Sequence, residues 1–270
     1  MHPVRSLAAF GQCLGQSGES LARFYGVLRR GAEAAASLLY PDVCQLCYEE
    51  RATRVEGYVG RQCRREIRFI VPPQCDRCGL PFQGDITERF ECTNCRELEL
   101  QFSQARACVA AQGMVLEVIH RWKYSRALWF EPFLVELLLR EALPSLAEAK
   151  WDLIVPVPLH GEKETEREFN QAERLAKPLA CASGLELGLD LVRRVQPTAT
   201  QTKLKRQERA SNLRGAFAAG PSARRARKQR VVLVDDVLTT GATASACARV
   251  LKAAGAADVC VWTVARGLLH

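Results

Sequence analysis

Apolar and polar positions follow an alternating pattern of short buried segments and amphipathic segments from about residue 105 to the C-terminus. The apolar runs predict strands near 105–111, 152–157, 189–194, 231–235 and 258–264. The intervening segments predict helices near 114–122, 130–142, 167–182 and 243–254. Such alternation is typical of a mostly parallel sheet covered by helices on both faces. Residues 101–270 are therefore predicted to form one α/β domain.

The first hundred residues follow a different pattern and divide into two parts. Residues 1–43 are rich in Ala and Leu, and the stretch 20–39 predicts an amphipathic helix. Packing of that helix on the rest of the protein is favoured over contact with a membrane or a partner. Residues 44–100 are rich in Cys, Arg and Gly and lack long periodic elements, which predicts a small Cys-rich module.

Composition narrows the class of protein. The chain has 270 residues, of which 48% are hydrophobic, so it can bury a substantial core. No apolar run approaches the roughly 18 residues that a membrane span requires, and no convincing signal-peptide core is present. Twelve cysteines, several in C-x-x-C pairs, favour metal binding over disulfides in a chain without an export route. We therefore expect a cytoplasmic protein without a membrane span.

Two C-x-x-C pairs form the stronger metal signal. The pairs Cys75-Asp-Arg-Cys78 and Cys92-Thr-Asn-Cys95 are separated by a spacer that zinc knuckles tolerate. Each pair can direct two thiolates to one ion, and two pairs complete a tetrahedral shell without an open position. The segment is too small to fold on its own apolar core, so bound zinc would supply folding energy. A structural, non-catalytic zinc is predicted here.

An incomplete copy of this device lies upstream. Cys44-Gln-Leu-Cys47 and Cys63 supply three thiols, but the position that would complete the second pair is Gly60. Two interpretations stay open: three thiolates hold a metal together with a water or a distant ligand, or the site has been lost. Five isolated cysteines in apolar contexts are predicted to be buried small hydrophobes: Cys13, Cys108, Cys181, Cys247 and Cys260.

The strongest ligand-binding signal is the segment Val-Val-Leu-Val-Asp-Asp-Val-Leu-Thr-Thr-Gly-Ala-Thr at 231–243. A buried strand is expected to end at Asp235 and Asp236, followed by a short loop and a helix N-terminus. Backbone N–H groups in such a loop cradle phosphate, and paired carboxylates can accept hydrogen bonds from sugar hydroxyls. The arrangement predicts a ribose 5-phosphate pocket, against the alternative of an ordinary strand–loop–helix unit.

This segment resembles the 5-phosphoribosyl 1-pyrophosphate (PRPP) motif of type I phosphoribosyltransferases. The resemblance implies a phosphoribosyltransferase-like sheet in which Asp235 and Asp236 bind the ribose 2′- and 3′-hydroxyls. It also implies that the 5′-phosphate is held by the loop residues Thr239, Thr240, Gly241, Ala242 and Thr243.

With the Cys-rich module in front, residues 38–266 resemble the ComF family, named for competence protein F of DNA uptake. Residues 152–160 (DLIVPVPLH) resemble its pyrophosphate-side loop, and Arg167-Glu-Phe-Asn-Gln171 matches its R-x-F-N-Q motif at the start of a helix. Residues 198–217 fall where related enzymes carry a mobile catalytic loop. Gly60 departs from the family's first metal site.

Positive charge is concentrated in two stretches of a chain with a net charge of +8. Residues 193–214 carry seven Lys/Arg against one Glu, and residues 222–230 carry five more. Basic surfaces neutralise a polyphosphate ligand or follow a nucleic-acid backbone. We favour the phosphate role for 193–214, while 222–230 is either a solvated loop or a nucleic-acid contact.

Two functions from different classes follow. The first is transfer of phosphoribosyl from PRPP with Mg²⁺ to an unknown acceptor, with Lys123, Lys203 and Arg209 as candidate catalytic cations. Purine-salvage relatives carry a carboxylate at the loop position held here by Thr239, so plain purine salvage is disfavoured. The second is binding of single-stranded DNA, with competence proteins as partners, in which the PRPP domain is a sensor or a non-catalytic relic.

Overall fold

The computed structural model describes residues 42–82, 84, 90–97, 99–159, 169–196 and 215–268. The helix predicted within 20–39, Cys13 and the segment that carries Lys203 and Arg209 lie outside these residues.

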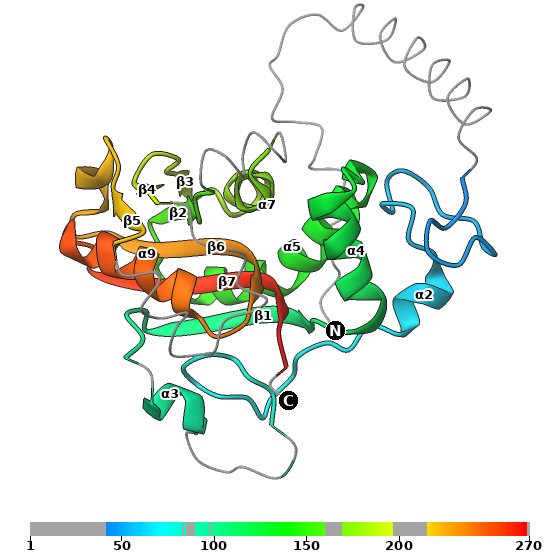
Figure 1. Ribbon diagram of the computed structural model, residues 1–270, viewed down its shortest axis with the longest axis horizontal. Coiled ribbons are helices and arrows are strands. Elements are labelled where there is room, and N and C mark those ends of the chain that lie inside the picture. The colour runs from blue at the N-terminus through cyan, green and yellow to red at the C-terminus, as the bar shows by residue number, and fades with distance from the viewer. Residues whose placement is uncertain are drawn as a thin grey trace, which may run out of the picture.

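A five-stranded, fully parallel sheet forms the centre of the molecule (Figure 1). Its order is β1-β7-β6-β2-β3. The strands are β1 (Gln104–Ala110), β7 (Asp258–Arg266), β6 (Arg230–Leu238), β2 (Leu153–Pro156) and β3 (Glu186–Leu187). The mostly parallel sheet predicted from the apolar pattern is confirmed.

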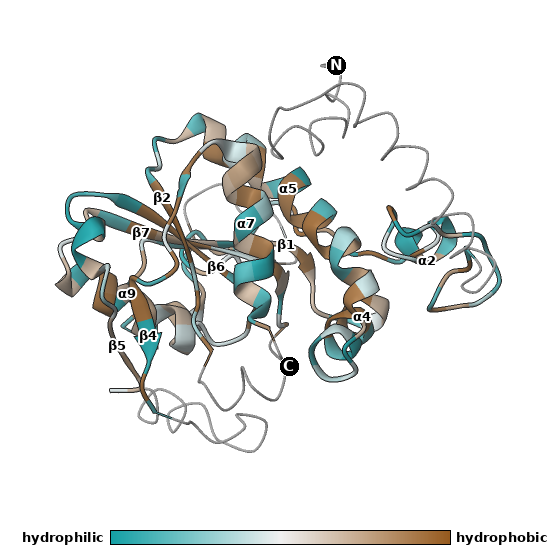
Figure 2. Ribbon diagram, turned by 90° about the horizontal axis from the view of Figure 1, so that it is seen from above, coloured by the Kyte–Doolittle hydropathy of each residue, from teal (hydrophilic) through white to brown (hydrophobic). Residues whose placement is uncertain are grey.

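Helices cover both faces of this sheet, as the alternating pattern predicts. One face carries α4 (Gly113–Tyr124), α5 (Glu131–Glu148) and α7 (Gln171–Ser183), and the other carries α9 (Ala242–Ala253). Successive side chains of β6 enter opposite cores: Val232 and Val234 lie with α5 and α7, whereas Val231 and Leu233 lie with α9. The apolar strands are therefore sandwiched between layers, as Figure 2 shows from above.

The connections reverse direction between β2 and β6. From β2 the chain passes through α7 to β3, on one side, and from β6 it passes through α9 to β7, on the other. Because α7 and α9 lie on opposite faces, their N-termini diverge and leave a crevice at the carboxyl ends of β2 and β6. Ligands of open α/β sheets bind at such switch points.

The strand that carries the two aspartates is longer than predicted. We expected it to end at Asp235 and Asp236, but β6 continues to Leu238. Its extension is stabilised on one side only: β7 pairs with β6 as far as Leu238, whereas β2 stops pairing at Val234. The aspartates consequently lie inside a strand whose β2-side edge is open to the crevice.

The strand predicted near 189–194 does not join the central sheet. Residues 192–194 form β4 (Val192–Arg194), which pairs in antiparallel fashion with β5 (Phe217–Ala219) in a separate two-stranded sheet. The place beside β2 is taken by Glu186 and Leu187. Pairing partners of such short strands depend on tertiary contacts, which apolar patterns do not encode.

Two further expectations need correction in α7. The helix begins at Gln171, because the Asn170 side chain accepts a hydrogen bond from the Ala172 N–H (3.0 Å) and caps it. Cys181 is exposed rather than buried, since it lies outside the buried stripe that includes Leu175, Leu179 and Ala180. Cys108, Cys247 and Cys260 are buried as predicted.

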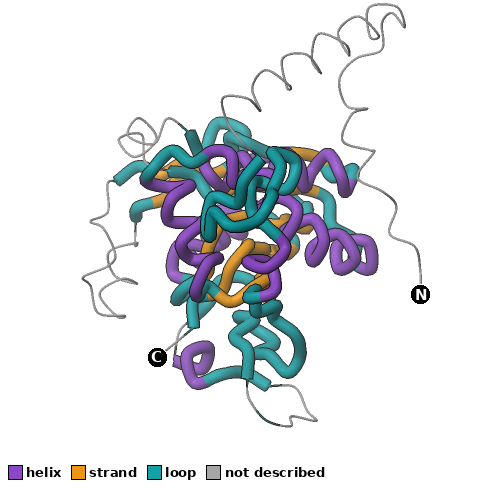
Figure 3. The backbone as a smooth tube through the Cα atoms, turned by 90° about the vertical axis from the view of Figure 1, so that its right-hand side faces the viewer, coloured by secondary structure: helices purple, strands orange, loops and turns teal. Residues whose placement is uncertain are grey.

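The Cys-rich residues are mostly loops (Figure 3), with short helices α2 (Arg61–Arg65) and α3 (Thr93–Glu97). They divide between the faces of the sheet: Cys44 and Cys63 pack in the core with α4 and α5, and Cys75 to Cys95 pack in the core with α9. The linking chain follows edge strand β1, where Phe69 bridges Val109.

Candidate functional site

A cavity of about 430 Å³ occupies the crevice at the carboxyl ends of β2 and β6. Its walls come from α4, from the residues that follow β2, from the start of α7, from β4, and from the segment between β6 and α9. All seven residues that the sequence assigns to ribose 5-phosphate line this cavity: Asp235, Asp236, Thr239, Thr240, Gly241, Ala242 and Thr243. The structure therefore brings the predicted ligand residues together.

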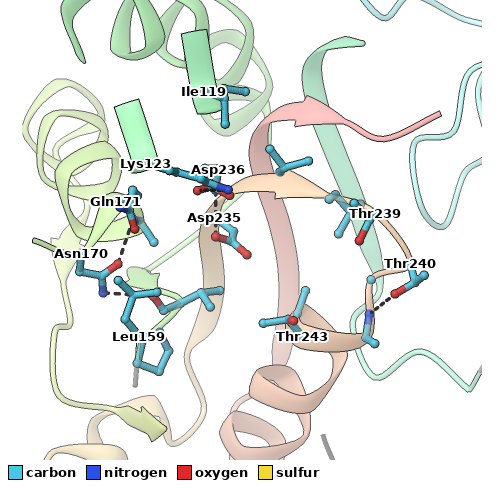
Figure 4. Close-up of a pocket in the computed structure, with 18 of the residues that line it drawn as sticks. Ile119, Lys123, Leu159, Asn170, Gln171, Asp235, Asp236, Thr239, Thr240 and Thr243 are labelled. Carbon is cyan, nitrogen blue, oxygen red and sulfur yellow. Dashed lines mark hydrogen bonds and ion pairs between the residues drawn. The ribbon is translucent and has the colours of Figure 1, made fainter. Parts of the chain in front are cut away.

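The carboxylate pair, Asp235 and Asp236, sits at the open edge of β6. Asp236 is buried and forms an ion pair with Lys123 of α4, with 2.6 Å between Nζ and Oδ2. Figure 4 shows the Lys123 ammonium reaching this carboxylate across the top of the cavity. Lys123, one of the three predicted catalytic cations, is thus placed in the site.

Asp235 has a different electrostatic environment. Its carboxylate accepts a hydrogen bond from the Asp236 N–H (2.9 Å). Burial and the neighbouring charge of Asp236 raise the pKa of Asp235 to about 7, although Lys123 and Arg194 oppose the shift. At neutral pH this carboxyl is poised between its two protonation states, so hydroxyl donors or a cation in the cavity would favour its ionised form.

The 239–243 loop carries the chain from β6 into α9. Gly241 adopts φ +80°, a left-handed conformation that glycine tolerates, and it immediately precedes α9. The Thr240 hydroxyl accepts a hydrogen bond from the Ala242 N–H (3.3 Å). Because the first amides of a helix lack intrahelical acceptors and carry partial positive charge, the turn presents an anion-binding end to the cavity.

Arg266 at the end of β7 holds this loop from beneath. Its guanidinium is buried and donates from Nη1 to the carbonyls of Leu238 (3.0 Å) and Thr239 (2.6 Å). The same side chain donates from Nε to the carbonyl of Cys78 (3.0 Å), and its Nη2 lies 3.5 Å from the Cys78 sulfur. One buried cation thus connects the second Cys-x-x-Cys segment to the loop.

Aromatic packing adds to that support. A Cβ built at Gly241 would lie 3.3 Å from Cζ of Phe102, so the ring of Phe102 lies directly under the loop. The Ser245 hydroxyl of α9 accepts a hydrogen bond from the Gln101 N–H (3.0 Å). The sequence analysis did not identify Arg266 or Phe102 as part of the site. For Arg266 the available signal was its charge at the end of a mostly apolar strand.

Other cavity residues complete the picture. Arg194 of β4 lines the wall, and the sequence indicated it only as one member of a basic stretch. Residues 157–159 line the cavity, as the pyrophosphate-side loop predicts, while His160 lies outside the described residues. Lys203 and Arg209 also lie outside them, so their catalytic roles stay predictions.

The second cysteine cluster, Cys75, Cys78, Cys92 and Cys95, converges as predicted. Its sulfur atoms lie 3.7 Å (Cys75–Cys95), 3.6 Å (Cys78–Cys92) and 3.6 Å (Cys92–Cys95) apart. Zinc–sulfur bonds of about 2.3 Å in a tetrahedron require sulfur separations of about 3.8 Å. All four ligand atoms lie within 4.8 Å of one another, so the cluster fits a closed zinc site.

The first cysteine cluster, Cys44, Cys47 and Cys63, also converges. The sulfurs of Cys44 and Cys63 are 3.7 Å apart, and the Cys44 sulfur accepts a hydrogen bond from the Gly60 N–H (3.3 Å). A carboxylate that the sequence did not indicate, Glu50, joins them within 4.8 Å. The three thiols have therefore kept the convergent arrangement of a metal site.

Known proteins are similar to this chain both in the Cys-rich residues and over most of its length. A model of the double zinc ribbon domain matches residues 35–96. Competence protein F of Haemophilus influenzae is 30% identical over 211 residues, which cover 76% of this chain and 88% of that protein. DNA utilization protein YhgH of Salmonella typhimurium is 31% identical over 234 residues, covering 86% of this chain and 100% of that protein.

The chain belongs to the ComF family. The resemblance predicted from the zinc-knuckle spacing and the PRPP-like segment is therefore confirmed. Among solved structures, adenine phosphoribosyltransferase from Thermoanaerobacter pseudethanolicus matches with a TM-score of 0.31 and 22% identity, over 55% of this chain and 71% of that one.

Across the described part of the chain, no helix combines the length and the apolar character that crossing a membrane demands.

Proposed function

We propose that the cavity binds PRPP or ribose 5-phosphate and that the protein transfers the phosphoribosyl group to an acceptor, with pyrophosphate leaving. The observation that carries this proposal is the shared cavity: the buried Asp236, the half-buried Asp235 and a helix-preceding loop face the same 430 Å³ space. Carboxylates suit ribose hydroxyls, and the loop amides suit a phosphate, so the two halves of one ligand have matching partners.

Each residue has a distinct role in this proposal. Asp235 and Asp236 accept hydrogen bonds from the ribose hydroxyls, and the 239–243 loop holds the 5′-phosphate. Lys123, already at the mouth beside Asp236, stabilises negative charge that develops on departing pyrophosphate. Mg²⁺ bound together with PRPP would neutralise pyrophosphate oxygens, and the carboxylate pair offers the hard oxygen ligands that this ion prefers. Lys203 and Arg209 remain the proposed additional cations.

The acceptor is left unassigned by the residues of the cavity. Thr239 supplies a hydroxyl where a purine-salvage mechanism needs a carboxylate, and a hydroxyl cannot take a proton at neutral pH. His120, which packs against Tyr124 with 4.7 Å between ring centroids, and Arg194 line the remaining wall. We therefore propose an acceptor other than a salvaged purine.

Calorimetric titration with PRPP, with and without Mg²⁺, tests the ligand. We expect the double variant Asp235→Asn/Asp236→Asn to lose at least about 2 kcal/mol of binding free energy, about 30-fold in affinity, because charge-assisted hydrogen bonds contribute roughly 1.5–3 kcal/mol each. The matched control is Asp152→Asn/Asp258→Asn, which removes two carboxylates at the amino ends of β2 and β7, the opposite end of the same sheet. Equal affinity in both double variants would refute the assignment.

The names of the relatives, competence protein F and DNA utilization protein, favour a second candidate function. We propose nucleic-acid binding, with single-stranded DNA and competence proteins as partners, as the alternative. The basic stretch 222–230 supports it, but not uniformly: Arg225 pairs with Glu186, and Arg230 pairs with Asp258 and lies over Trp151. Arg224, Arg227 and Lys228 are exposed, so they are the residues best placed to contact phosphates.

Fluorescence anisotropy with a short oligothymidine over a range of salt concentrations tests this alternative. The stretch ends at Arg230, the first residue of β6, and Asp235 lies five positions further along, so about 16 Å of strand at 3.3 Å per residue separates the two sites. Arg224→Glu/Lys228→Glu should therefore weaken DNA binding and lower its salt slope, which is about 0.7 per neutralised phosphate, without changing PRPP affinity. Arg140→Glu/Lys177→Glu on α5 and α7 is the control, and DNA binding unchanged in the first variant would exclude this surface.

We also propose a cytoplasmic location, because two convergent thiol clusters require a compartment that keeps cysteines reduced and metal-competent.

A further inference from the structure

The first cysteine cluster has a chemical peculiarity that its spacing leaves unexplained. A second C-x-x-C pair would place a thiol at position 60, where this chain has glycine. Yet Cys44, Cys47 and Cys63 keep their convergent arrangement. A tetrahedral site formed by these three thiols would need a fourth ligand from elsewhere in the chain.

Glu50 occupies the missing corner. A Cβ built at Gly60 would lie 2.1 Å from Cδ, 2.3 Å from Oε1 and 2.4 Å from Cγ of Glu50. The carboxylate therefore fills the volume in which the side chain of a cysteine at position 60 would begin. The backbone at Gly60 (φ −77°, ψ 170°) is accessible to any residue, so the obstacle to a cysteine there is the Glu50 side chain rather than the backbone conformation.

The distances fit one ion. Glu50 Oε1 lies 3.9 Å from the Cys47 sulfur, and the Cys44 and Cys63 sulfurs are 3.7 Å apart. A tetrahedral zinc with bonds of about 2.3 Å to sulfur and about 2.0–2.2 Å to oxygen requires separations of about 3.5–3.8 Å. Three thiolates and a carboxylate also give the ion four negative charges, the same total as four thiolates.

The carboxylate is held in this orientation by α2. Its oxygens accept hydrogen bonds from the Gln62 N–H (3.0 and 3.1 Å) and the Cys63 N–H (3.3 Å). The Gln62 N–H reaches both carboxylate oxygens, so one oxygen keeps a bond to α2 while the other faces the thiols, and hydrogen bonds of this kind orient metal ligands elsewhere. They also define the competing explanation, in which Glu50 only caps α2.

We propose that Glu50 is the fourth ligand of a zinc ion held by Cys44, Cys47 and Cys63. The carboxylate of Glu50 then takes the place of the thiolate that a cysteine at position 60 would supply, and glycine at position 60 leaves room for it. Because oxygen is a harder donor than sulfur for this ion, the site binds zinc less tightly than the second cysteine cluster.

Zinc content of the purified chain tests the proposal. The wild type should contain two zinc ions and lose the first-cluster ion earlier under a competing chelator. Glu50→Gln should contain one, because the amide keeps the hydrogen bonds to α2 but is a poor zinc ligand. Glu49→Gln, at the exposed neighbouring position, is the matched control and should keep two. Iodoacetamide labelling of Cys47 and Cys63, mapped by mass spectrometry, identifies the vacated cluster.

An exchange variant separates ligation from capping. Glu50→Ala/Gly60→Cys opens the corner and restores a fourth thiol, so zinc binding should return to two ions. With cobalt, the thiolate count rises from seven to eight, which raises the sulfur-to-metal charge-transfer absorbance by about one seventh. Two zinc ions in Glu50→Gln with unchanged chelator kinetics would overturn the proposal in favour of a cap. A single zinc ion in the wild type would overturn it as well.

Discussion

The two cysteine clusters use related spacing but brace different parts of the domain. Arg64 attaches the first cluster to α5, donating to Glu136 (2.8 and 3.0 Å) and lying over the ring of Phe133. Arg266 attaches the second cluster to the 239–243 loop through Cys78, Leu238 and Thr239. The same metal-binding device therefore stabilises a helical layer on one face and the proposed phosphate site on the other.

Because of this difference, loss of metal from one cluster should affect ligand binding in the cavity more than loss of metal from the other. The second cluster reaches the loop directly through the buried side chain of Arg266. The first cluster reaches the cavity only indirectly, through α4. Arg121 of α4 donates a hydrogen bond to the carbonyl of Gln45, and Lys123, two positions further along the same helix, lines the cavity. Loss of the second ion should consequently disturb the cavity more than loss of the first.

The largest expected effect comes from removing one thiol of each cluster. Cys78→Ser should lower the free energy of unfolding by at least about 3 kcal/mol, since structural zinc contributes roughly 10–16 kcal/mol in isolated modules. Because Cys78 is also the anchor of Arg266, ribose 5-phosphate affinity should fall at least about tenfold. Cys47→Ser should lose its ion but keep that affinity within about twofold. Urea unfolding measures the stability, elemental analysis measures the zinc content, and calorimetry measures the ligand affinity. Equal losses of affinity in Cys78→Ser and Cys47→Ser would contradict the proposed difference between the clusters.

The next effect tests the two arginines directly. Arg266→Lys should weaken ribose 5-phosphate binding while zinc content stays at the wild-type value. An ammonium cannot span Cys78 and the loop carbonyls together, and each buried carbonyl left without a donor costs about 1–3 kcal/mol. Arg64→Lys is the matched control: it should lower stability by a similar mechanism and leave ligand affinity unchanged. If Arg266→Lys binds the ligand as the wild type does, the loop does not depend on the second cluster.

The smallest effect concerns pH and should be independent of both clusters. The pKa of Asp235 is raised from 3.8 to about 7 in the folded protein, so the native state binds more protons than the unfolded state between these values. Stability supplied by this group is present below about pH 4 and is lost as pH rises through 7. Ligand affinity should change in the opposite sense, rising as Asp235 ionises.

Asp235→Asn should therefore flatten the decrease of the melting temperature between about pH 4 and 7, the window between the pKa of Asp235 in the unfolded and in the folded protein. Cys47→Ser should keep the wild-type slope. A melting temperature whose pH dependence is the same in Asp235→Asn and the wild type would show that another group titrates there.

Local sequence determined the elements and the chemistry that lies within them. Apolar runs identified β1, β2, β6 and β7, because most positions of these strands are buried against one of the two helical layers. The aspartate pair, the 239–243 loop and the start of α9 are consecutive, so their meeting at one cavity follows from chain connectivity. The paired C-x-x-C spacing likewise predicted the second cluster.

Tertiary structure decided what joins distant residues. Glu50 meets the corner left by Gly60 only because the chain between them turns back, and Arg266 reaches Cys78 across 188 positions of sequence. β6 extends to Leu238 because β7 pairs with it along its whole length. β4 lies outside the central sheet because it pairs with β5 instead. Burial energies and hydrogen-bond partners of this kind depend on packing between elements, and a pattern read along one segment does not contain them.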